Sequence, residues 1–185
     1  VQFTAKAFDY YGDEIPAAPQ WSATGGVIGS SGLYQAPDRA GTYTITAFCG
    51  GQAATARVEV LLSMRAALAH DTSDLGPGVQ AGDRVLIFFN GRTDRPAITS
   101  ANIGTILPLG GGHSWGSISS ARWHSTAAPP GVMWYGGDAL EITFAGSGTT
   151  LLPGDVIGNT RIRDYWEPEQ LAQMGRLGGK FTWVE

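Results

Sequence analysis

The chain has 185 residues, of which 43% are hydrophobic and 15% are charged, and its formal net charge is −4. This length fits one large domain or two small ones, and the apolar fraction is enough for a packed core. With 27 Gly and few of the residues that favour helices, the composition excludes an all-α protein. Neither half carries the basic face that sequence-independent nucleic-acid binding requires, so we expect no nucleic-acid partner.

The start of the chain and its one cysteine bear on its setting. No stretch approaches the roughly 18 consecutive apolar residues of a membrane span, so we expect no membrane insertion. The chain opens inside an alternating run at Val1, with no signal peptide visible, which suggests a piece or a processed form of a longer protein. Cys49 has no second cysteine with which to form a disulfide. We expect it to be a small hydrophobic residue in or near a sheet, and a cross-link to another chain is the alternative.

The first part of the chain alternates in hydrophobicity with period 2. Apolar residues occupy every second position in the runs 1–7, 43–47 and 54–60, and turn signals rich in Gly separate these runs. This pattern predicts an Ig-like β-sandwich over residues 1–62. Trp21, in a short middle strand, is expected to fill its core, with a ligand platform as the alternative.

The remainder, residues 63–185, predicts a second and larger β-sandwich, so that the chain is all-β with two tandem domains. The dipeptide Gly-Asp precedes an alternating run three times, and the aspartates of these dipeptides are Asp83, Asp138 and Asp155. Gly supplies a turn with positive φ, and Asp bonds nearby backbone N–H groups as the strand begins. We also expect a single helical turn within 99–106 and one short helix over 167–174.

Residues 1–60 resemble the bacterial Ig-like domains of the group 2 type. The motifs that carry the resemblance are Gln20-Trp21-Ser22-Ala23, Gly32-Leu33-Tyr34-Gln35-Ala36-Pro37 and Gly41-Thr42-Tyr43-Thr44-Ile45-Thr46-Ala47. The family implies a spacer or adhesive module without enzyme activity. Its members usually have one more strand before the one that starts here at Val1. We therefore expect either a chain cut at that point or a strand supplied by a neighbouring chain, which would assemble a filament by strand sharing.

Residues 66–184 resemble a repeat of large cell-surface proteins from algae, oomycetes and some bacteria. The resemblance rests on Ala69-His70-Asp71 with Gly82-Asp83, on the stretch 88–93, and on Gly137-Asp138 with the run that follows it. The function of that repeat is structural, so the resemblance implies an extracellular setting.

The sequence offers no catalytic motif. The spacing of His70, His113 and His124 matches no H-E-x-x-H or H-x-H metal motif, and no G-x-S-x-G elbow is present. The stretch Gly110–Gly116 contains adjacent His113 and Ser114, but neighbours in a loop seldom face one another and no acid lies close in sequence. We expect a surface loop or wide turn there and no enzyme activity.

Acidic residues suggest a calcium site. Asp71, Asp74 and Asp83, together with Asp94, could bring several carboxylate oxygens to one strand end, and calcium takes six to eight such oxygens. Solvated turn residues are the alternative, and we expect no other cofactor.

The second domain is rich in tryptophan, which suggests a sugar site. Flat, exposed rings stack on sugar faces, and Tyr135 and Trp166 are the candidate ligand-binding residues. Both could instead pack between domains or subunits. Trp123 and Trp183 alternate with polar residues and are expected in the core.

Together these features predict a non-enzymatic extracellular or cell-surface module of an adhesin, fibre or filament. Its partners would be other copies of itself or neighbouring domains of a longer chain. The alternative is a carbohydrate-binding accessory module of a secreted enzyme, with a polysaccharide as partner.

Overall fold

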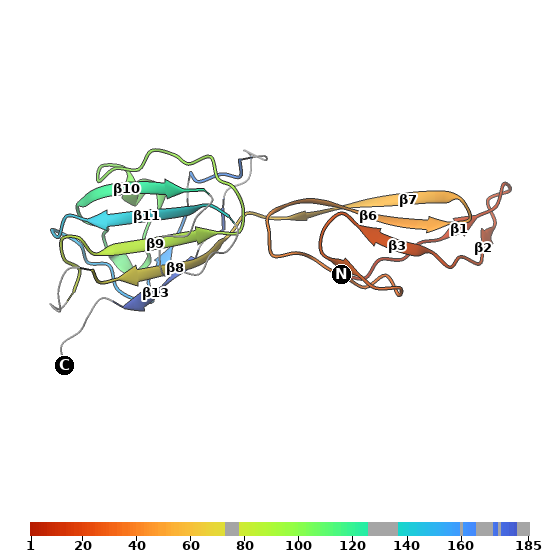
Figure 1. Cartoon of the computed structure of the whole chain (residues 1–185), viewed down its shortest axis with the longest axis horizontal. Coiled ribbons are helices and arrows are strands. Elements are labelled where there is room, and N and C mark those ends of the chain that lie inside the picture. Colours follow the sequence, from red (N-terminus) through yellow and green to blue (C-terminus); the bar gives the residue numbers. More distant parts are fainter. Residues whose placement is uncertain (73–77, 126–136, 160, 166–171, 174, 181–185) are drawn as a thin grey trace. The chain divides into compact units, whose positions relative to one another are not determined.

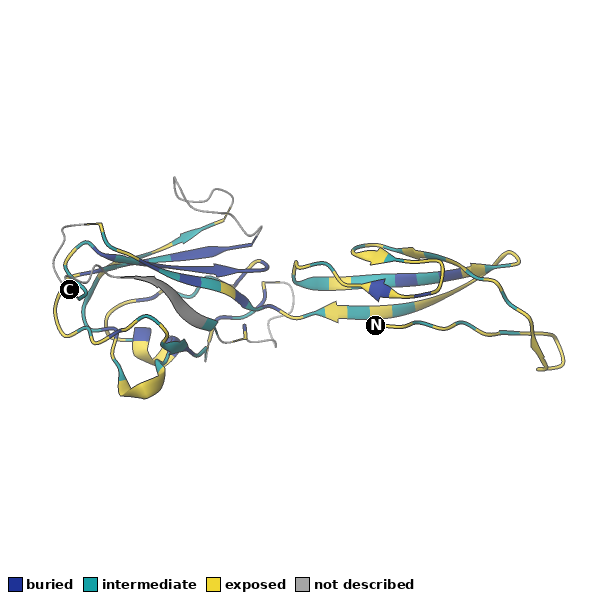
Figure 2. Ribbon diagram, turned by 90° about the horizontal axis from the view of Figure 1, so that it is seen from below, coloured by how far each residue is buried: buried dark blue, intermediate teal, exposed yellow. Residues whose placement is uncertain are grey.

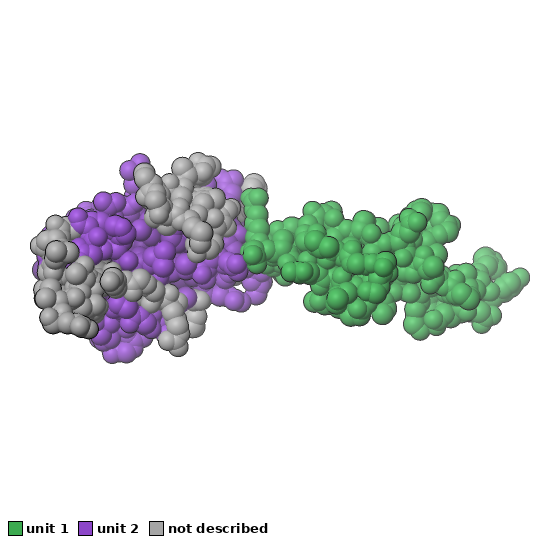
Figure 3. Space-filling view, turned by 60° about the horizontal axis from the view of Figure 1, so that its bottom comes forward, with its two compact units in different colours: residues 1–60 green, residues 61–185 purple. Residues whose placement is uncertain are grey.

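The computed structural model describes residues 1–72, 78–125, 137–159, 161–165, 172–173 and 175–180. The chain forms two compact units, unit 1 at residues 1–60 and unit 2 at residues 61–185 (Figure 3). Both are built from strands, which confirms the expected all-β fold class. None of the helices within the described residues is long and apolar enough to cross a membrane.

The boundary lies two residues before the expected one because Asn90 ties the junction to unit 2. The backbone N–H of Ser63 donates to the Asn90 side chain at 2.7 Å, and the Asn90 amide donates to the Leu61 carbonyl at 3.1 Å. The Leu62 side chain is fully buried. The junction therefore belongs to the packing of the second unit.

Unit 1 consists of a three-stranded sheet and two short hairpins (Figure 1). Its sheet has the order β3-β6-β7, with antiparallel neighbours. Val1 to Phe3 pair with Gly32 to Tyr34 through two backbone hydrogen bonds and a third from the Val1 amino group to the Tyr34 carbonyl. The strands of unit 1 are β1 (Ala7–Phe8), β2 (Glu14–Ile15), β3 (Gln20–Ala23), β4 (Val27–Ile28), β5 (Tyr34–Gln35), β6 (Gly41–Cys49) and β7 (Gln52–Val60).

The hairpin of β6 and β7 follows directly from its sequence. The two-residue turn uses Gly50 at φ +59° and Gly51 at φ +83°, the positive angles that a type I′ turn needs and that glycine adopts without strain. From this turn the register runs unbroken from Cys49 opposite Gln52 to Gly41 opposite Val60. Ile45 is buried, whereas Thr alternates onto the opposite face, as the period-2 pattern predicts.

A small aromatic cluster forms the core of unit 1. The Phe3 ring lies 6.5 Å from the Trp21 ring and 6.0 Å from the Tyr34 ring, so Trp21 takes the packing role expected of it. The Tyr34 hydroxyl donates to the Gly25 carbonyl at 2.8 Å. Burial, and secondarily the neighbouring Tyr43, raise the pKa of Tyr34 above its ordinary value. The buried hydrophobic residues of this unit are Tyr34, Ile45 and Ala47.

Unit 2 contains one six-stranded sheet in the order β10-β11-β9-β8-β13-β12. All neighbours are antiparallel except β8 and β13, which run parallel. Its elements are β8 (Met64–His70), β9 (Arg84–Phe89), α1 (Ile103–Ile106), the 3-10 turn η1 (Gly110–Gly112), β10 (Ile118–His124), β11 (Ala139–Phe144), β12 (Val156–Ile157) and β13 (Gly175–Lys180).

One face of this sheet packs against a layer of loops that includes α1 and η1. The buried Trp115 ring stacks on Phe144 of β11 with centroids 6.4 Å apart, and its indole N–H donates to the Leu107 carbonyl. Strand β9 is buried on both faces, because Leu86 and Phe88 form a further cluster with Ala139 on the other side. Figure 2 shows this buried centre in dark blue, whereas most of unit 1 is half-buried or exposed.

Two expected helices have different outcomes. The single turn within 99–106 is present as α1. The helix expected over 167–174 lies mostly outside the described residues. Its described members, Ala172 and Gln173, are not helical: the Gln173 N–H donates to the Leu62 carbonyl at 3.0 Å, and Gln173 forms a parallel bridge with Ser63. Leu62 and Ser63 of the same chain supply these contacts in place of a helical turn.

Candidate functional site

The Gly-Asp dipeptides act as turn devices at two of their three positions. Asp83 is buried, and its carboxylate accepts the backbone N–H of Gln80 at 2.8 Å and that of Thr72 at 3.2 Å. Asp155 likewise accepts the N–H of Leu152 at 2.8 Å. The preceding glycines have φ of +96° and +97°. The turn chemistry predicted from sequence is therefore confirmed at both sites, where Asp bonds the residue three positions earlier.

Asp138 serves a different purpose and holds a distant loop. Its fully buried carboxylate accepts the N–H and the hydroxyl of Thr93 at 2.8 and 3.0 Å, and two N–H groups of Arg95 at 3.0 and 2.8 Å. Side-chain hydrogen bonding to Asp138 is the main reason that the pKa of Arg95 rises above its ordinary value. Gly137 is needed here for space, since a Cβ would lie 2.1 Å from the Phe89 carbonyl oxygen. We call Asp138, Thr93 and Arg95 the Asp138 clamp.

The calcium hypothesis involves one residue outside the described part of the chain. Asp74 lies outside it, Asp71 is half-buried, and both Asp83 oxygens accept backbone N–H groups. Asp94 accepts the N–H of Arg163 at 3.0 Å. Among the described residues, no three His, Cys, Asp or Glu side chains gather as metal ligands would. Calcium binding stays a prediction.

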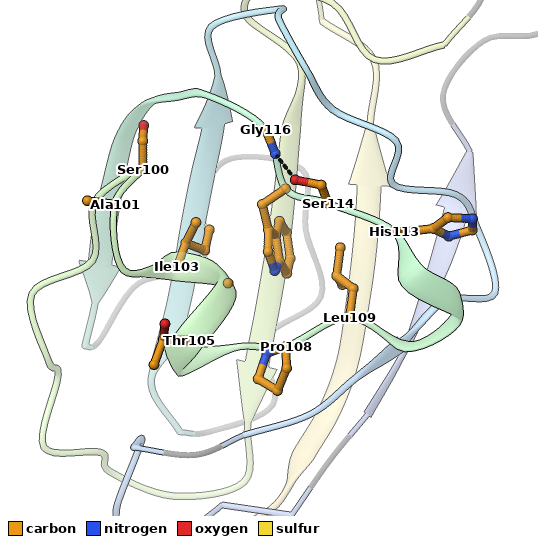
Figure 4. A pocket seen from close by; sticks show the side chains of 11 residues that line it. Ser100, Ala101, Ile103, Thr105, Pro108, Leu109, His113, Ser114 and Gly116 are labelled. Atoms are coloured by element: carbon orange, nitrogen blue, oxygen red, sulfur yellow. Dashed lines mark hydrogen bonds between the residues drawn. The ribbon is translucent and has the colours of Figure 1, made fainter.

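A cavity of about 320 Å³ in unit 2 lies between α1 and the loop that carries Gly110–Gly116 (Figure 4). The Ser114 hydroxyl in its wall accepts the N–H of Gly116 at 3.1 Å. The His113 imidazole points away from Ser114, and its Nδ1 lies 2.8 and 2.9 Å from the two oxygens of Asp155. His113 and Ser114 thus form no nucleophile pair. Trp115 is 1% exposed and offers no ring face to a ligand.

The acid beside His113 is a contact that sequence reasoning missed. Asp155 follows His113 by 42 residues, so the observation that no acid lies close to His113 in the sequence did not reveal it. The third Gly-Asp dipeptide was the available signal, because it places a carboxylate at the start of β12. The other histidines lie elsewhere: His70 ends β8, and His124 on β10 contacts Glu141 of β11 at 3.1 Å.

The two candidate sugar-binding residues, Tyr135 and Trp166, lie outside the described residues, as does Trp183. Trp123 is half-buried, packs on Phe89 with ring centroids 5.8 Å apart and donates to the Pro96 carbonyl. Trp123 therefore packs against the core at Phe89, but it is not itself fully buried as a core residue would be. The hypothesis of a carbohydrate site in unit 2 stays untested.

Unit 1 exposes more large hydrophobic side chains than it buries. Tyr10 and Tyr11, at the tip of the β1–β2 hairpin, are 96% and 86% exposed, with their rings edge to face at 5.5 Å. The Asp9 carboxylate accepts the N–H groups of Tyr11 and Asp13, both at 2.9 Å, which fixes the turn. The large exposed hydrophobic residues of unit 1 are Val1, Phe8, Tyr10, Tyr11, Ile15, Val27, Leu33 and Phe48.

A groove of about 450 Å³ lies between the base of the β1–β2 hairpin and the turn of the β6–β7 hairpin. It is bounded by residues 5–8, by residues 15–19 and by the hairpin end of β6 and β7, and its lining is mostly apolar. Cys49 contributes to the wall from the end of β6 and is half-buried, in keeping with its expected place in a sheet. The exposed aromatic tip of the β1–β2 hairpin and the apolar groove together make this end of unit 1 the candidate interaction surface.

Comparison with protein families, with curated proteins and with solved structures finds no match to this chain. The two family resemblances seen in the sequence therefore stay predictions.

Proposed function

We propose that this chain is a non-enzymatic structural module, extracellular or at the cell surface, that joins copies of itself or neighbouring domains into a larger assembly. The joining surface is on unit 1. The proposal corresponds to an adhesin, fibre or filament component, and its action is mechanical, since paired strands and a packed core resist extension.

One observation carries the proposal. In unit 1, all of whose residues the structure describes, eight large hydrophobic side chains are exposed and three hydrophobic residues are buried. Isolated exposed hydrophobic residues are ordinary, but a 60-residue domain buries a smaller share of its surface than a larger domain does and is only marginally stable. Covering these side chains with a partner would add apolar burial that the unit lacks on its own.

The polar groups of unit 2 support the same proposal. The carboxylates of Asp83, Asp138 and Asp155 bind backbone N–H groups or side chains of neighbouring loops. These contacts hold the loops around the sheet, and the carboxylate oxygens are used as hydrogen-bond acceptors within the fold. Their arrangement suits a load-bearing scaffold.

The opening segment, residues 1–3, gives no support to strand sharing at that position. Val1 and Phe3 hydrogen-bond to Tyr34 and Gly32 within the same chain. A neighbour that inserted a strand between these segments would have to break those bonds. We therefore place the joining surface elsewhere on unit 1, at the hairpin tip and along the sheet edge.

Light scattering and electron microscopy of the full chain test the proposal. We expect the average mass to rise beyond that of a dimer as the concentration increases. In the double variant Tyr10→Ser/Tyr11→Ser, growth should require about tenfold or more higher concentration, because aromatic anchors dominate interfaces and tenfold corresponds to roughly 1.4 kcal/mol. The turn itself is held by Asp9 and is unchanged.

Leu152→Ser is the matched control, because Leu152 is a 42% exposed apolar residue of unit 2. It should assemble as the unmodified chain does. A monodisperse monomer at all concentrations would overturn the proposal, and unchanged growth in the double tyrosine variant would remove the hairpin tip from it.

A further inference from the structure

Strand β7 is an unusually open sheet edge. It is nine residues long, and among the described residues its one ladder partner is β6. The β6–β7 register shows no shift over its whole length, so β7 contains no bulge, and the strand contains neither Pro nor Lys. Natural monomers often protect a sheet edge with a bulge, a proline or a lysine, because an unprotected edge pairs with other strands. The edge of β7 is therefore suited to main-chain pairing.

The hairpin turn determines which backbone groups face outward. A two-residue turn makes its flanking residues, Cys49 and Gln52, a hydrogen-bonded pair, and hydrogen-bonded pairs alternate along an antiparallel ladder. Val58 therefore directs its N–H and C=O toward Tyr43 on β6. The residues whose backbone groups point away from β6 are Ala53, Thr55, Arg57 and Glu59.

We propose that β7 pairs antiparallel with β7 of a second copy of this chain, about a two-fold axis at Val58. The two three-stranded sheets then become one sheet of six strands. This inference rests on the proposed assembly function and names its partner and surface. A two-fold contact closes a dimer, so growth beyond the dimer requires the separate hairpin tip.

Charge selects the partner and the register. With the axis at Val58, Arg57 lies opposite Glu59 of the second copy, and the reverse pair forms on the other side of the axis. An axis at Arg57 or at Glu59 would place that residue opposite its own copy in the second chain. Parallel in-register pairing would do the same for both residues, and like charges opposite each other are unfavourable. An axis at Ala56 would pair more backbone but would leave neither charge opposite its complement. Arg57 also donates to the Thr42 hydroxyl, and the new pairs would add to that contact.

The apolar face agrees with the same register. Ala56, Val58 and Val60 lie on the inner face of the sheet and are half-buried in one chain. With the axis at Val58, the two Val58 side chains meet, and each Ala56 lies beside Val60 of the second copy. Pairing therefore covers apolar surface on one face while it joins opposite charges on the other.

Cysteine cross-linking tests the register directly. Because Val58 bonds toward β6, the two Val58 residues would form a non-hydrogen-bonded pair with Cα atoms about 4.5 Å apart, within the range of a disulfide. In a Cys49→Ser background, Val58→Cys should give a covalent dimer under mild oxidation on a non-reducing gel. Ala56→Cys is the matched control, since it would face Val60 and should give little dimer.

Charge reversal provides an independent test without cysteines. Arg57→Glu places two carboxylates opposite each other twice, so the dimer dissociation constant from sedimentation should rise about tenfold or more. The double variant Arg57→Glu/Glu59→Arg restores opposite pairs and should restore dimerisation. Failure of this rescue would contradict the proposed register.

The outcomes separate this inference from the proposed function. Assembly by light scattering without a Val58→Cys cross-link would overturn the β7 pairing and leave the assembly function standing. Cross-linking through Ala56→Cys in place of Val58→Cys would overturn the register. A monomer at every concentration, with no cross-link, would overturn both.

Discussion

Replacement of Asp138 by Ala is expected to lower the free energy of unfolding of unit 2 by about 3 kcal/mol or more. The substitution removes the carboxylate of the Asp138 clamp and leaves the Thr93 N–H and the Arg95 guanidinium without that partner. Removing one member of a buried ion pair typically costs about 3–5 kcal/mol, and the partial exposure of Arg95, at 32%, places the expected value at the lower end. Denaturant unfolding followed by tryptophan fluorescence measures this change.

Asp94→Ala is the matched control for the clamp. Asp94 belongs to the same loop and accepts one backbone N–H, that of Arg163, but it is exposed. Its loss should cost about 1 kcal/mol, as for a single ordinary hydrogen bond. Equal losses in the two variants would show that burial of the clamp contributes nothing to the stability of unit 2.

Replacement of Ile45 by Ala is expected to unfold unit 1 at temperatures where the unmodified unit is folded. Ile45 is 1% exposed and lies at the centre of a small core. An Ile→Ala change in a core costs about 2–5 kcal/mol, whereas a domain of this size has a total stability of roughly 3–9 kcal/mol at the usual value per residue. Hydrogen exchange of the full chain should show lost protection along β6 and β7, with unit 2 still protected.

Phe48→Ala is the control for this experiment. Phe48 is on the same strand but 47% exposed, and it lies on the opposite face from Ile45. Its removal leaves no core cavity and should change protection little. Equal loss of protection in the two variants would contradict the expectation that buried residues such as Ile45 stabilise unit 1 more than exposed ones such as Phe48.

The strands and their faces were predictable because alternation is a local property. The run from Tyr43 to Ala47 buries Ile45 and turns its threonines to the other face, as its period requires. The glycine turns were equally predictable, since Gly82 and Gly154 adopt the positive φ that few other residues tolerate. Residue type and the nearest neighbours suffice for both.

Partners distant in the chain were not predictable. The sequence showed that Asp138 begins a strand, but its hydrogen-bond partners, Arg95 and Thr93, lie 43 and 45 positions earlier. Trp115 follows three glycines, which suggested an exposed loop, yet its ring is buried on Phe144. The layer that covers the sheet of unit 2 consists largely of loops, and loops carry no periodic signal.

The sequence by itself therefore determined the all-β class, the alternation of faces and the positions of the sharp turns, since these depend on backbone preferences and spacing within a few residues. Only the tertiary structure decided that β13 lies between β8 and β12, that Asp155 meets His113, and that β7 is left at the edge of its sheet. These arrangements follow from which surfaces pack together, and the packing of segments far apart in the chain has no counterpart in local sequence.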